Sequence, residues 1–263
     1  MSIVDFHSHL IPGVDDGAMD VEESLEGVRA LAEQGVSTAI VTPHLDASLT
    51  LDEADLNARL AEIDAGWAAH QAAAAADEPA IRLGRGVELS LDTPHPVIED
   101  VRLLLDGGPF LLLEFPFMAV PPHSARAVRT LRDLGVIPVI AHPERYHNLG
   151  DPVRQVGEWR DAGAYVQVNG ASLLGRYGKR AREHALVLLR HGWADYLASD
   201  YHSRGDPQVR LYEEALLESG GDEQATLLMR GNPNRLLQGR APLPVPPMDA
   251  RNSLWDGVMS FFQ

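Results

Sequence analysis

Short apolar runs rich in β-forming residues alternate with helical patterns along most of the chain, from the N-terminus to about Gly239. This alternation is typical of a parallel sheet whose crossover connections are helices. The expected strands, seven in all, are Ile3–Phe6, Thr38–Thr42, Ile81–Val87, Phe110–Phe115, Ile137–Ala141, Tyr165–Val168 and Tyr196–Ser199. Seven such units predict an α/β fold in which the sheet closes, or nearly closes, into a TIM-like barrel.

The segments between the expected strands have the spacing of amphipathic helices. The first of them is the clearest, because Asp20 and Glu23 form a capping-box pattern and Gly35 can end the helix. The other expected helices are Asp52–Ala76, Ser124–Leu134, Val153–Ala162, Arg180–His191, Gln208–Glu218 and Glu223–Met229.

The domain organisation follows from length and from a change in composition near the C-terminus. A chain of 263 residues that is 45% hydrophobic can bury one large core, and residues 1–240 are predicted to form it. Four prolines between 242 and 247 favour an extended linker, and a short apolar terminus follows at 254–262. We expect residues 241–263 to form a tail outside the barrel. Docking on its own body is favoured over docking on another subunit or a partner.

Composition excludes several classes of function. The formal net charge of -16 disfavours nucleic acid, since binding it normally requires a basic surface. The absence of cysteine excludes disulfides, thiolate zinc sites and cysteine nucleophiles. No run approaches the ~18 to 20 apolar residues of a membrane span, and the N-terminus lacks the pattern of a signal peptide. We therefore expect a cytoplasmic protein with no membrane span.

Most expected strands end in histidine, aspartate or glutamate, which is where barrel enzymes place catalytic groups. The first strand leads into His7 and His9, whose alternation puts both imidazoles on one face. The residues in this position are His7, His9, His44, Glu88, Glu114, His142, Asp200 and His202, with Asn169 as a weaker candidate. Since a lone histidine or glutamate is usually structural, the coincidence at successive strand ends carries the argument.

With one aspartate of the Asp15–Asp16 pair, the set comprises five imidazoles and four carboxylates. A tetrahedral ion takes about four ligands, so this number predicts a multinuclear cluster. Imidazole suits zinc, iron and manganese, whereas carboxylates favour manganese and magnesium. The remaining six of the eleven histidines lie in expected helices or loops and are left out of the site: His70, His95, His123, His147, His184 and His191.

The same residues resemble the motifs of the PHP phosphoesterase family, whose fold is a distorted seven-stranded β/α barrel. The resemblance is closer still to the bacterial capsule-biosynthesis tyrosine phosphatases of the CpsB/CapC type, and it spans about Met1 to Leu237. The motifs that carry it are His7-Ser8-His9-Leu10-Ile11-Pro12-Gly13-Val14-Asp15-Asp16-Gly17, Thr42-Pro43-His44, Glu114-Phe115-Pro116-Phe117, His142-Pro143-Glu144-Arg145 and Asn232-Pro233.

The resemblance implies about three divalent ions, with manganese preferred and iron, zinc or magnesium as alternatives. The implied ligand sets are His7, His9, Glu88 and Asp200 for one ion, Glu88, Glu114 and His142 for a second, and Asp16, His44 and His202 for a third. Asp15 is the alternative ligand in this loop. We prefer Asp16 because the acidic ligand of the family usually stands directly before a glycine, as Asp16 does.

Two further roles are implied by the same resemblance. Arg145 corresponds to an arginine that contacts phosphate, and His202 is a candidate to assist the leaving group. The family pattern has a second arginine shortly after Asp200, and the segment here departs from that pattern. Either Arg204 or Arg210 supplies this second arginine, or the chain lacks it.

The resemblance implies a metal-dependent protein-tyrosine phosphatase. Its expected partner is a phosphotyrosine protein, the tyrosine-rich tail of a bacterial tyrosine kinase that controls capsular or exopolysaccharide synthesis. The alternatives are a small-molecule phosphomonoesterase of the histidinol-phosphatase type and a metal-dependent amidohydrolase, although the latter usually has lysine or histidine where this chain has Glu114. A non-enzymatic scaffold that binds the kinase tail is a fourth reading, and it gives no chemical reason for nine ligands. The number of subunits is left open.

Overall fold

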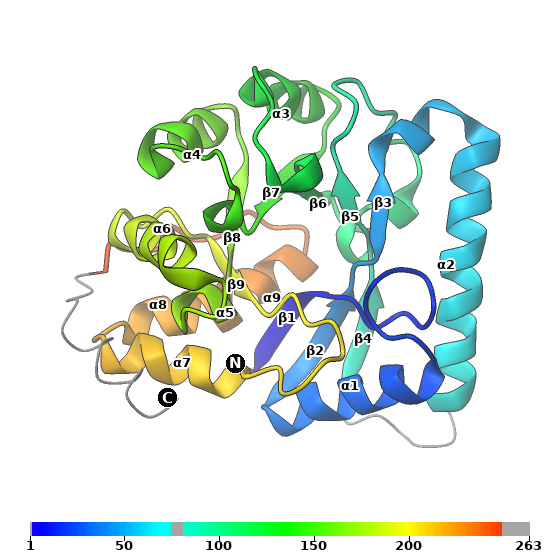
Figure 1. The fold of residues 1–263 in the computed structure, drawn as a ribbon, viewed down its shortest axis with the longest axis horizontal. Helices are drawn as coiled ribbons and strands as arrows, with labels where there is room; N and C mark the ends of the chain where they lie inside the picture. The colour runs from blue at the N-terminus through cyan, green and yellow to red at the C-terminus, as the bar shows by residue number, and fades with distance from the viewer. Residues whose placement is uncertain (1, 75–80, 249–263) are drawn as a thin grey trace.

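The structure is a computed structural model that describes residues 2–74 and 81–248. Strands occupy the middle of the molecule and helices surround them (Figure 1). Within the described residues there are nine strands: β1 (Ile3–Ser8), β2 (Val36–Val41), β3 (His44–Asp46), β4 (Arg82–Arg85), β5 (Glu88–Ser90), β6 (Phe110–Glu114), β7 (Ile137–Ala141), β8 (Tyr165–Asn169) and β9 (Tyr196–Ala198). Every pairing between them is parallel. The predicted α/β class is confirmed.

The strands form two sheets rather than one, in the orders β1-β2-β4 and β3-β5-β6-β7-β8-β9. β3 and β5 are additional to the seven expected strands, and each begins shortly after a strand of the first sheet has ended. Pro43 separates β2 from β3 and has no N–H to donate to a ladder. Its carbonyl accepts from the N–H of Glu88 at 3.0 Å, while the N–H of Gly86 donates to Val41 at 3.0 Å. The interruption between β2 and β3 therefore lies beside the interruption between β4 and β5.

The two sheets also meet where β1 and β9 end. The N–H of Asp200 donates to the carbonyl of His7 at 2.9 Å, and the N–H of His9 donates to that of Tyr201 at 2.8 Å. Below them, the buried carboxylate of Asp5 accepts from both the N–H and the hydroxyl of Ser199. These bonds bring the first and last strand ends, each with expected metal ligands, into contact.

The helices are α1 (Val21–Glu33), α2 (Glu53–Ala74), α3 (Ser124–Asp133), α4 (Pro152–Asp161), α5 (Gly170–Leu173), α6 (Gly178–Arg190), α7 (Val209–Glu218), α8 (Asp222–Thr226) and α9 (Asn232–Leu237). The predicted start of α1 is confirmed, because the side chain of Asp20 accepts from the N–H of Glu23 at 3.0 Å. α5 and α9 are additional to the expected helices. The expected helix at 223–229 is α8 followed by a π-helical turn at Leu227–Gly231. Residues 75 and 76 of the expected second helix lie outside the described residues.

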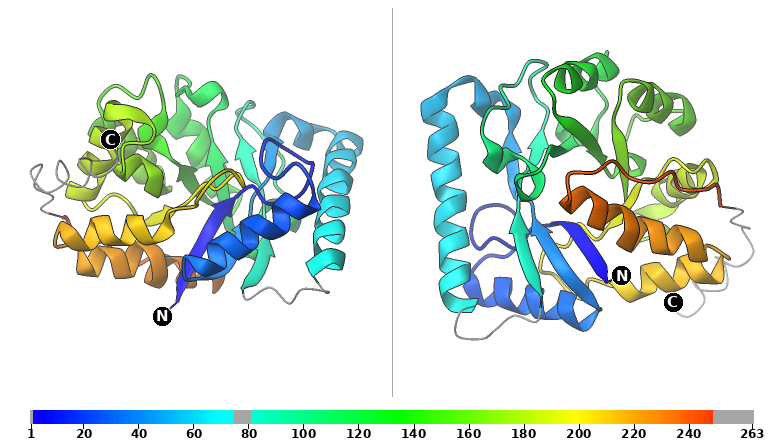
Figure 2. Two further views of the ribbon diagram at one scale, coloured as in Figure 1. Left: turned by 60° about the horizontal axis from the view of Figure 1, so that its bottom comes forward. Right: turned by 180° about the vertical axis from the view of Figure 1, so that it is seen from behind.

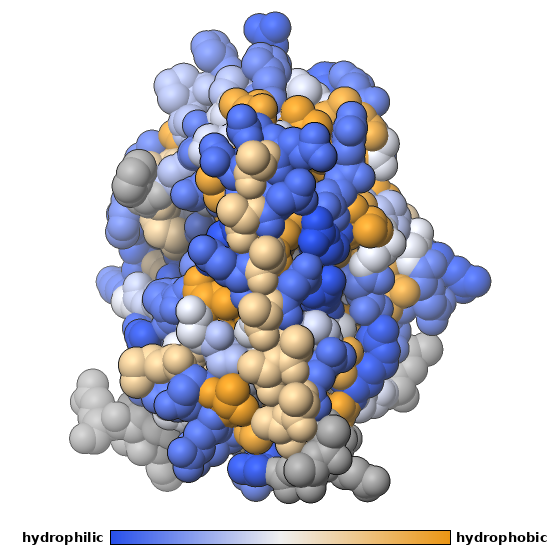
Figure 3. Space-filling model, turned by 90° about the vertical axis from the view of Figure 1, so that its right-hand side faces the viewer, coloured by the Kyte–Doolittle hydropathy of each residue, from blue (hydrophilic) through white to orange (hydrophobic). Residues whose placement is uncertain are grey.

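The outer face of α2 is lined with alanine. This helix buries Leu60 and Ile63 among other residues, while a pale stripe runs down its exposed side in Figure 3. The exposed alanines of α2 are Ala54, Ala58, Ala61, Ala65, Ala68, Ala69 and Ala72. Alanine has the highest intrinsic helix propensity, so the composition suits a long helix exposed on one side. No helix in the described part of the chain has the length and apolarity needed to cross a membrane.

The described part of the proline-rich segment lies against the body of the protein. In Figure 2 it runs across the back of the molecule. Val245 and Met248 are buried in the main apolar core. The N–H of Leu243 donates to Oδ1 of Asn232 at 2.8 Å, and the N–H of Met248 donates to the carbonyl of Leu189 at 3.1 Å. The expected apolar terminus at 254–262 lies outside the described residues, and the division at residue 240 stays a prediction.

Candidate metal centre

Two fully buried imidazoles lie at the end of β1, and Nδ1 of each ring faces a side-chain oxygen. Nδ1 of His7 lies 3.0 Å from the acceptor Oε1 of Gln167, and Nδ1 of His9 lies 2.8 Å from Oδ2 of Asp15. Both rings therefore carry a proton on Nδ1 and turn Nε2 toward the interior of the site. Metal-binding histidines are usually oriented by such an acceptor on the second ring nitrogen.

Four donor atoms converge in front of these rings. Oε2 of Glu88 and Oδ1 of Asp200 each lie 3.2 Å from Nε2 of His7 and 3.3 Å from Nε2 of His9, and the two Nε2 atoms are 3.3 Å apart. A cation about 2.1 Å from each donor would set neighbouring donors roughly 3.0 to 3.4 Å apart, in octahedral or tetrahedral geometry. Oε2 of Glu88 is buried and makes no hydrogen bond. The donors present thus fit a divalent ion.

Further donors extend the cluster on both sides of Glu88. Its other oxygen, Oε1, lies 2.9 Å from Nε2 of His142. Nδ1 of His44 lies 3.2 Å from Oε2 of Glu88 and 3.6 Å from Oε1 of Glu114. On the opposite side of the His44 ring, Nε2 lies 3.5 Å from Oδ1 of Asp16.

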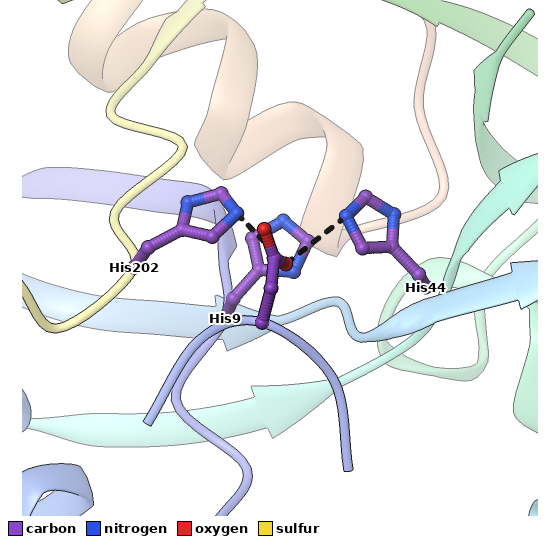
Figure 4. Close-up of side chains that lie close together, drawn as sticks. His9, His44 and His202 are labelled. Atoms are coloured by element: carbon purple, nitrogen blue, oxygen red, sulfur yellow. Dashed lines mark ion pairs between the residues drawn. The ribbon is translucent and has the colours of Figure 1, made fainter. Parts of the chain in front are cut away.

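Asp16 connects two imidazoles that come from distant parts of the chain. Its Oδ1 lies 3.3 Å from Nε2 of His202 as well as close to His44, and Figure 4 shows these two rings approaching from opposite sides with His9 between them. The rings of His9 and His202 stack with centroids 4.1 Å apart. Nδ1 of His202 lies 2.8 Å from the carbonyl of Asp200, so it carries the proton and Nε2 faces Asp16.

All nine expected ligands thus lie together. Within the described residues they form three groups whose donor atoms lie within 4.8 Å of one another: His9, Asp16, His44 and His202; His7, Glu88, His142 and Asp200; His44, Glu88 and Glu114. The six histidines left out by sequence reasoning join none of these groups. His70, for example, is a buried residue of α2, and its Nδ1 lies 2.7 Å from the hydroxyl of Ser24 in α1.

The backbone has an unusual conformation or an unusually close contact at three positions that place expected metal ligands. His142 and Asp200 both have left-handed φ values, 32° and 54°, although neither is glycine. Such conformations are costly and concentrate at functional sites. Gly17 has a different role: a Cβ there would lie 1.9 Å from the carbonyl oxygen of His9. Only glycine allows the loop with Asp15 and Asp16 to pass so close to the end of β1.

The electrostatics of the cluster favour bound cations. Burial opposes charge on His7, but the carboxylates of Glu88 and Asp200 outweigh it and raise its pKa to about 10. Burial likewise disfavours ionised Glu88 and Asp200, yet the adjacent imidazoles hold both pKa values well below their usual range. Burial and the charge of Glu88 raise the pKa of Glu114 to about 8. Protons on the imidazoles thus compensate the carboxylates in the protein alone, and divalent ions would take over that role.

Arg145 lies at the edge of the cluster. Its guanidinium group forms an ion pair with Oδ2 of Asp200, which also accepts from Nδ2 of Asn169 at 3.1 Å. The ring of Tyr177 lies 4.0 Å from Cζ of Arg145, a cation–π contact that fixes the guanidinium plane. Arg145 retains 22% of its side-chain exposure, so it reaches both the site and solvent.

The two candidates for a second arginine lie in different places. Arg204 donates from Nη2 to the carbonyl of Asp16 at 2.7 Å and so lies beside the cluster. Arg210 donates to the carbonyl of Glu33, and its N–H donates to Oε1 of Gln34 at 3.1 Å. It is therefore held at the C-terminal end of α1, and the geometry favours Arg204.

Sequence reasoning missed two residues that shape the site. Gln167, which orients His7, stands in β8 between the buried apolar residues Val166 and Val168. A buried polar side chain in an apolar strand, on the same face as Asn169, is a signal that could have identified it. Tyr177 lies between α5 and α6, and nothing in the local pattern indicates its contact with Arg145.

Known proteins are similar to this chain over nearly its whole length. Tyrosine-protein phosphatase YwqE of Bacillus subtilis is 28% identical over 258 residues, which cover 95% of this chain and 97% of that protein. Tyrosine-protein phosphatase CpsB of Streptococcus pneumoniae is 26% identical over 246 residues, which cover 89% of this chain and 98% of that protein.

Solved structures are also similar to this chain over nearly its whole length. One from a study of YwqE and CpsB as metal-dependent tyrosine phosphatases superposes with a TM-score of 0.75 at 27% identity, covering 95% of this chain and all of that one (100%). The phosphotriesterase homology protein of Escherichia coli superposes with a TM-score of 0.55 at 13% identity, covering 90% of this chain and 99% of that one, and shows likeness of fold alone. The family model described as capsular polysaccharide synthesis, CpsB/CapC, matches residues 3–238. The chain therefore belongs to the CpsB/CapC family.

Proposed function

We propose that this protein is a metal-dependent phosphatase that hydrolyses phosphotyrosine on protein substrates. The observation that supports it most is the gathering of nine metal-type residues in three adjoining groups, two of which share Glu88, with Arg145 at their edge. The relatives named tyrosine-protein phosphatases, and the metal dependence stated for YwqE and CpsB, agree with this chemistry.

The donors would hold about three divalent ions, with manganese as the proposed metal and iron, zinc or magnesium as alternatives. His7, His9, Glu88 and Asp200 would hold one ion, as their mutual distances of 3.2 to 3.3 Å support. The proposed ligands of the others are Glu88, Glu114 and His142 for the second, and Asp16, His44 and His202 for the third. Three divalent ions against four carboxylates would leave a net charge of about plus two, which attracts a phosphate dianion.

Bound ions of this kind lower the pKa of coordinated water toward ~7 and neutralise charge that develops on a phosphoryl group. The ligand residues would hold these ions, and neighbouring groups orient the ligand imidazoles. Gln167 and Asp15 fix the tautomers of His7 and His9, and the carbonyl of Asp200 fixes that of His202. Since Nε2 of His202 has no proton in that tautomer, the geometry favours a ligand over a general acid for this residue.

Arg145 would bind the phosphoryl oxygens. Its ion pair with Asp200 places the guanidinium group at the cluster, and the ring of Tyr177 limits its freedom. Arginine can bind phosphate through two parallel N–H donors, which orients the group as well as holding it. Arg204, held by the carbonyl of Asp16, would contribute the second positive charge.

The proposed substrate is the tyrosine-rich tail of a bacterial tyrosine kinase that controls capsular or exopolysaccharide synthesis. The match to the capsular polysaccharide family supports it. A cytoplasmic location is part of the same proposal, because such a kinase tail would have to be reached there.

We also infer that the two sheets are a distorted seven-stranded barrel. β3 follows β2 and β5 follows β4 in the chain, so each pair can be counted as one interrupted strand. The order would then run from β1 through both interrupted strands to β6, β7, β8 and β9. The bonds of Asp200 to His7 and of His9 to Tyr201 would close it.

The function is tested by substrate profiling of the manganese-loaded protein. A phosphotyrosine peptide, histidinol phosphate and an amide substrate of amidohydrolases would be compared at equal concentration. The proposal requires the largest kcat/KM for the phosphotyrosine peptide and its loss on chelation. Faster turnover of histidinol phosphate would favour the small-molecule phosphatase, and faster turnover of the amide would favour the amidohydrolase.

A further inference from the structure

A short basic segment stands out in this acidic protein. Residues 176–182 read Arg-Tyr-Gly-Lys-Arg-Ala-Arg, which is four of the 22 lysines and arginines in a chain with 38 acidic residues. The segment connects α5 to α6 and forms the first turn of α6. Arg176, Lys179 and Arg180 are exposed, and Lys179 keeps 89% of its side-chain exposure.

Helix stability does not explain these charges. The first turn of α6 has no acidic residue, which is also true of α3, α4 and α7, whereas the first turns of α1, α2 and α8 each have two. The N-terminal end of a helix carries partial positive charge, so Lys179 and Arg180 there are unfavourable for the helix itself. The helix dipole thus does not account for these charges, and what distinguishes them is their position beside the turn that carries Arg145.

The basic segment rests directly on the turn that presents Arg145. α6 packs against the 3₁₀ turn Pro143–Arg145. The ring of Tyr177 lies 4.0 Å from Cζ of Arg145. Nη1 of Arg180 donates to the carbonyl of His147 at 2.9 Å, two residues after Arg145. The segment is therefore continuous with the proposed phosphate site. A substrate peptide that leaves this site on the side of α6 would contact the segment.

We propose that residues 176–182 bind negatively charged residues that flank the phosphotyrosine in the protein substrate. This inference rests on the proposed function and specifies its substrate class: a peptide with a second phosphotyrosine, or with aspartate or glutamate, close to the one being hydrolysed. Arginine and lysine pair favourably with phosphate and carboxylate groups, and complementary charge at the rim of a site selects among partners. In a protein with net charge -16, such a peptide would otherwise be repelled.

The experiment uses the full chain loaded with manganese and three substrates. These are a phosphotyrosine peptide with neutral flanks, the same peptide with glutamates at the flanking positions, and p-nitrophenyl phosphate. The test variant is R176Q/K179Q. Its matched control is R129Q/R154Q, because both residues are exposed and Arg154 lies 3.7 Å from Glu158 as Lys179 lies 3.7 Å from Glu183.

In the unmodified protein we expect kcat/KM for the acidic peptide to exceed that for the neutral one by about tenfold at low salt, and the advantage to shrink as salt is added. R176Q/K179Q should lose most of this advantage through a higher KM. Its hydrolysis of p-nitrophenyl phosphate and its metal content should match those of the unmodified protein and of the control.

Equal kcat/KM for the two peptides in the unmodified protein would overturn the inference. A parallel loss on p-nitrophenyl phosphate in R176Q/K179Q would also overturn it, since the segment would then only support Arg145. Absence of metal-dependent hydrolysis of all three substrates would instead overturn the proposed function, and this inference with it.

Discussion

Oδ2 of Asp15 lies 2.8 Å from Nδ1 of His9, on the side of the imidazole that faces away from Glu88 and Asp200. Asp16, the next residue, points its carboxylate at Nε2 of His44 and of His202 instead. The two neighbouring aspartates therefore have different roles in our account: Asp15 orients a ligand, and Asp16 is one.

Replacing each aspartate by asparagine should separate these roles. D16N should lose about one ion per chain even at high manganese, because His44 and His202 alone cannot replace its carboxylate. D15N should bind the full number of ions, with an affinity lowered about 10- to 100-fold, because a neutral amide with one acceptor oxygen replaces the carboxylate that serves both His9 and Gly17. Elemental analysis at several manganese concentrations measures both. Loss of an ion in D15N at saturating manganese, with full retention in D16N, would reverse the assignment.

Glu88 and His70 provide a contrast between the site and the core. E88A should abolish phosphatase activity, since both oxygens of this carboxylate face expected ligands of different ions. H70A should retain activity but unfold at lower temperature, because it removes a buried ring and one of the two hydrogen-bond partners of the Ser24 hydroxyl, at a cost of about 1–3 kcal/mol. Thermal unfolding and peptide hydrolysis are measured for both. Similar losses of activity in the two variants would count against the ligand set.

Metal binding should depend on pH through His7. Glu88 and Asp200 outweigh burial and raise the pKa of this imidazole to about 10, so the metal-free protein holds a proton there at pH 7. An incoming ion must displace it, and manganese affinity should therefore rise with pH up to about 10, with proton release on binding. Calorimetry in buffers of different ionisation enthalpy measures the protons released. Binding without proton release between pH 6.5 and 8.5 would contradict this.

Arg145 should act on the phosphate rather than on the ions. R145Q should lower kcat/KM for a phosphotyrosine peptide by about 100-fold, because a charge-assisted contact to the phosphoryl group is lost. Its manganese content should be unchanged, since Asp200 keeps its place among His7 and His9. R145K should recover part of the activity through its charge alone. A variant R145Q that loses ions together with activity would assign Arg145 a structural role.

Much of the fold could be predicted from the sequence, and the exceptions have physical reasons. The periodicity located the parallel strands and the major helices. It does not report where a ladder must break, as it does at Pro43 and Gly86, because that depends on which backbone groups meet across strands. The packing of Val245 and Met248 into the core is likewise tertiary, since a run of prolines has the same pattern whether it is docked or free.

The candidate site shows the same division. Eight of its nine donors could be identified because the ends of parallel strands meet at one edge, so that position in the sequence implies position in space. Asp16 lies in the loop after β1, and only the family resemblance indicated it. The partners that orient them had no such signal, apart from the buried polar position of Gln167. The contact of Tyr177 with Arg145 joins residues on different elements, and only the tertiary structure brings them together.

The central claim is tested most directly by metal analysis of the purified protein, coupled to hydrolysis of a phosphotyrosine peptide before and after chelation. We predict about three divalent ions per chain, loss of hydrolysis when they are removed, and recovery when manganese is returned. A metal-stripped protein that cleaves the peptide at the full rate would contradict it.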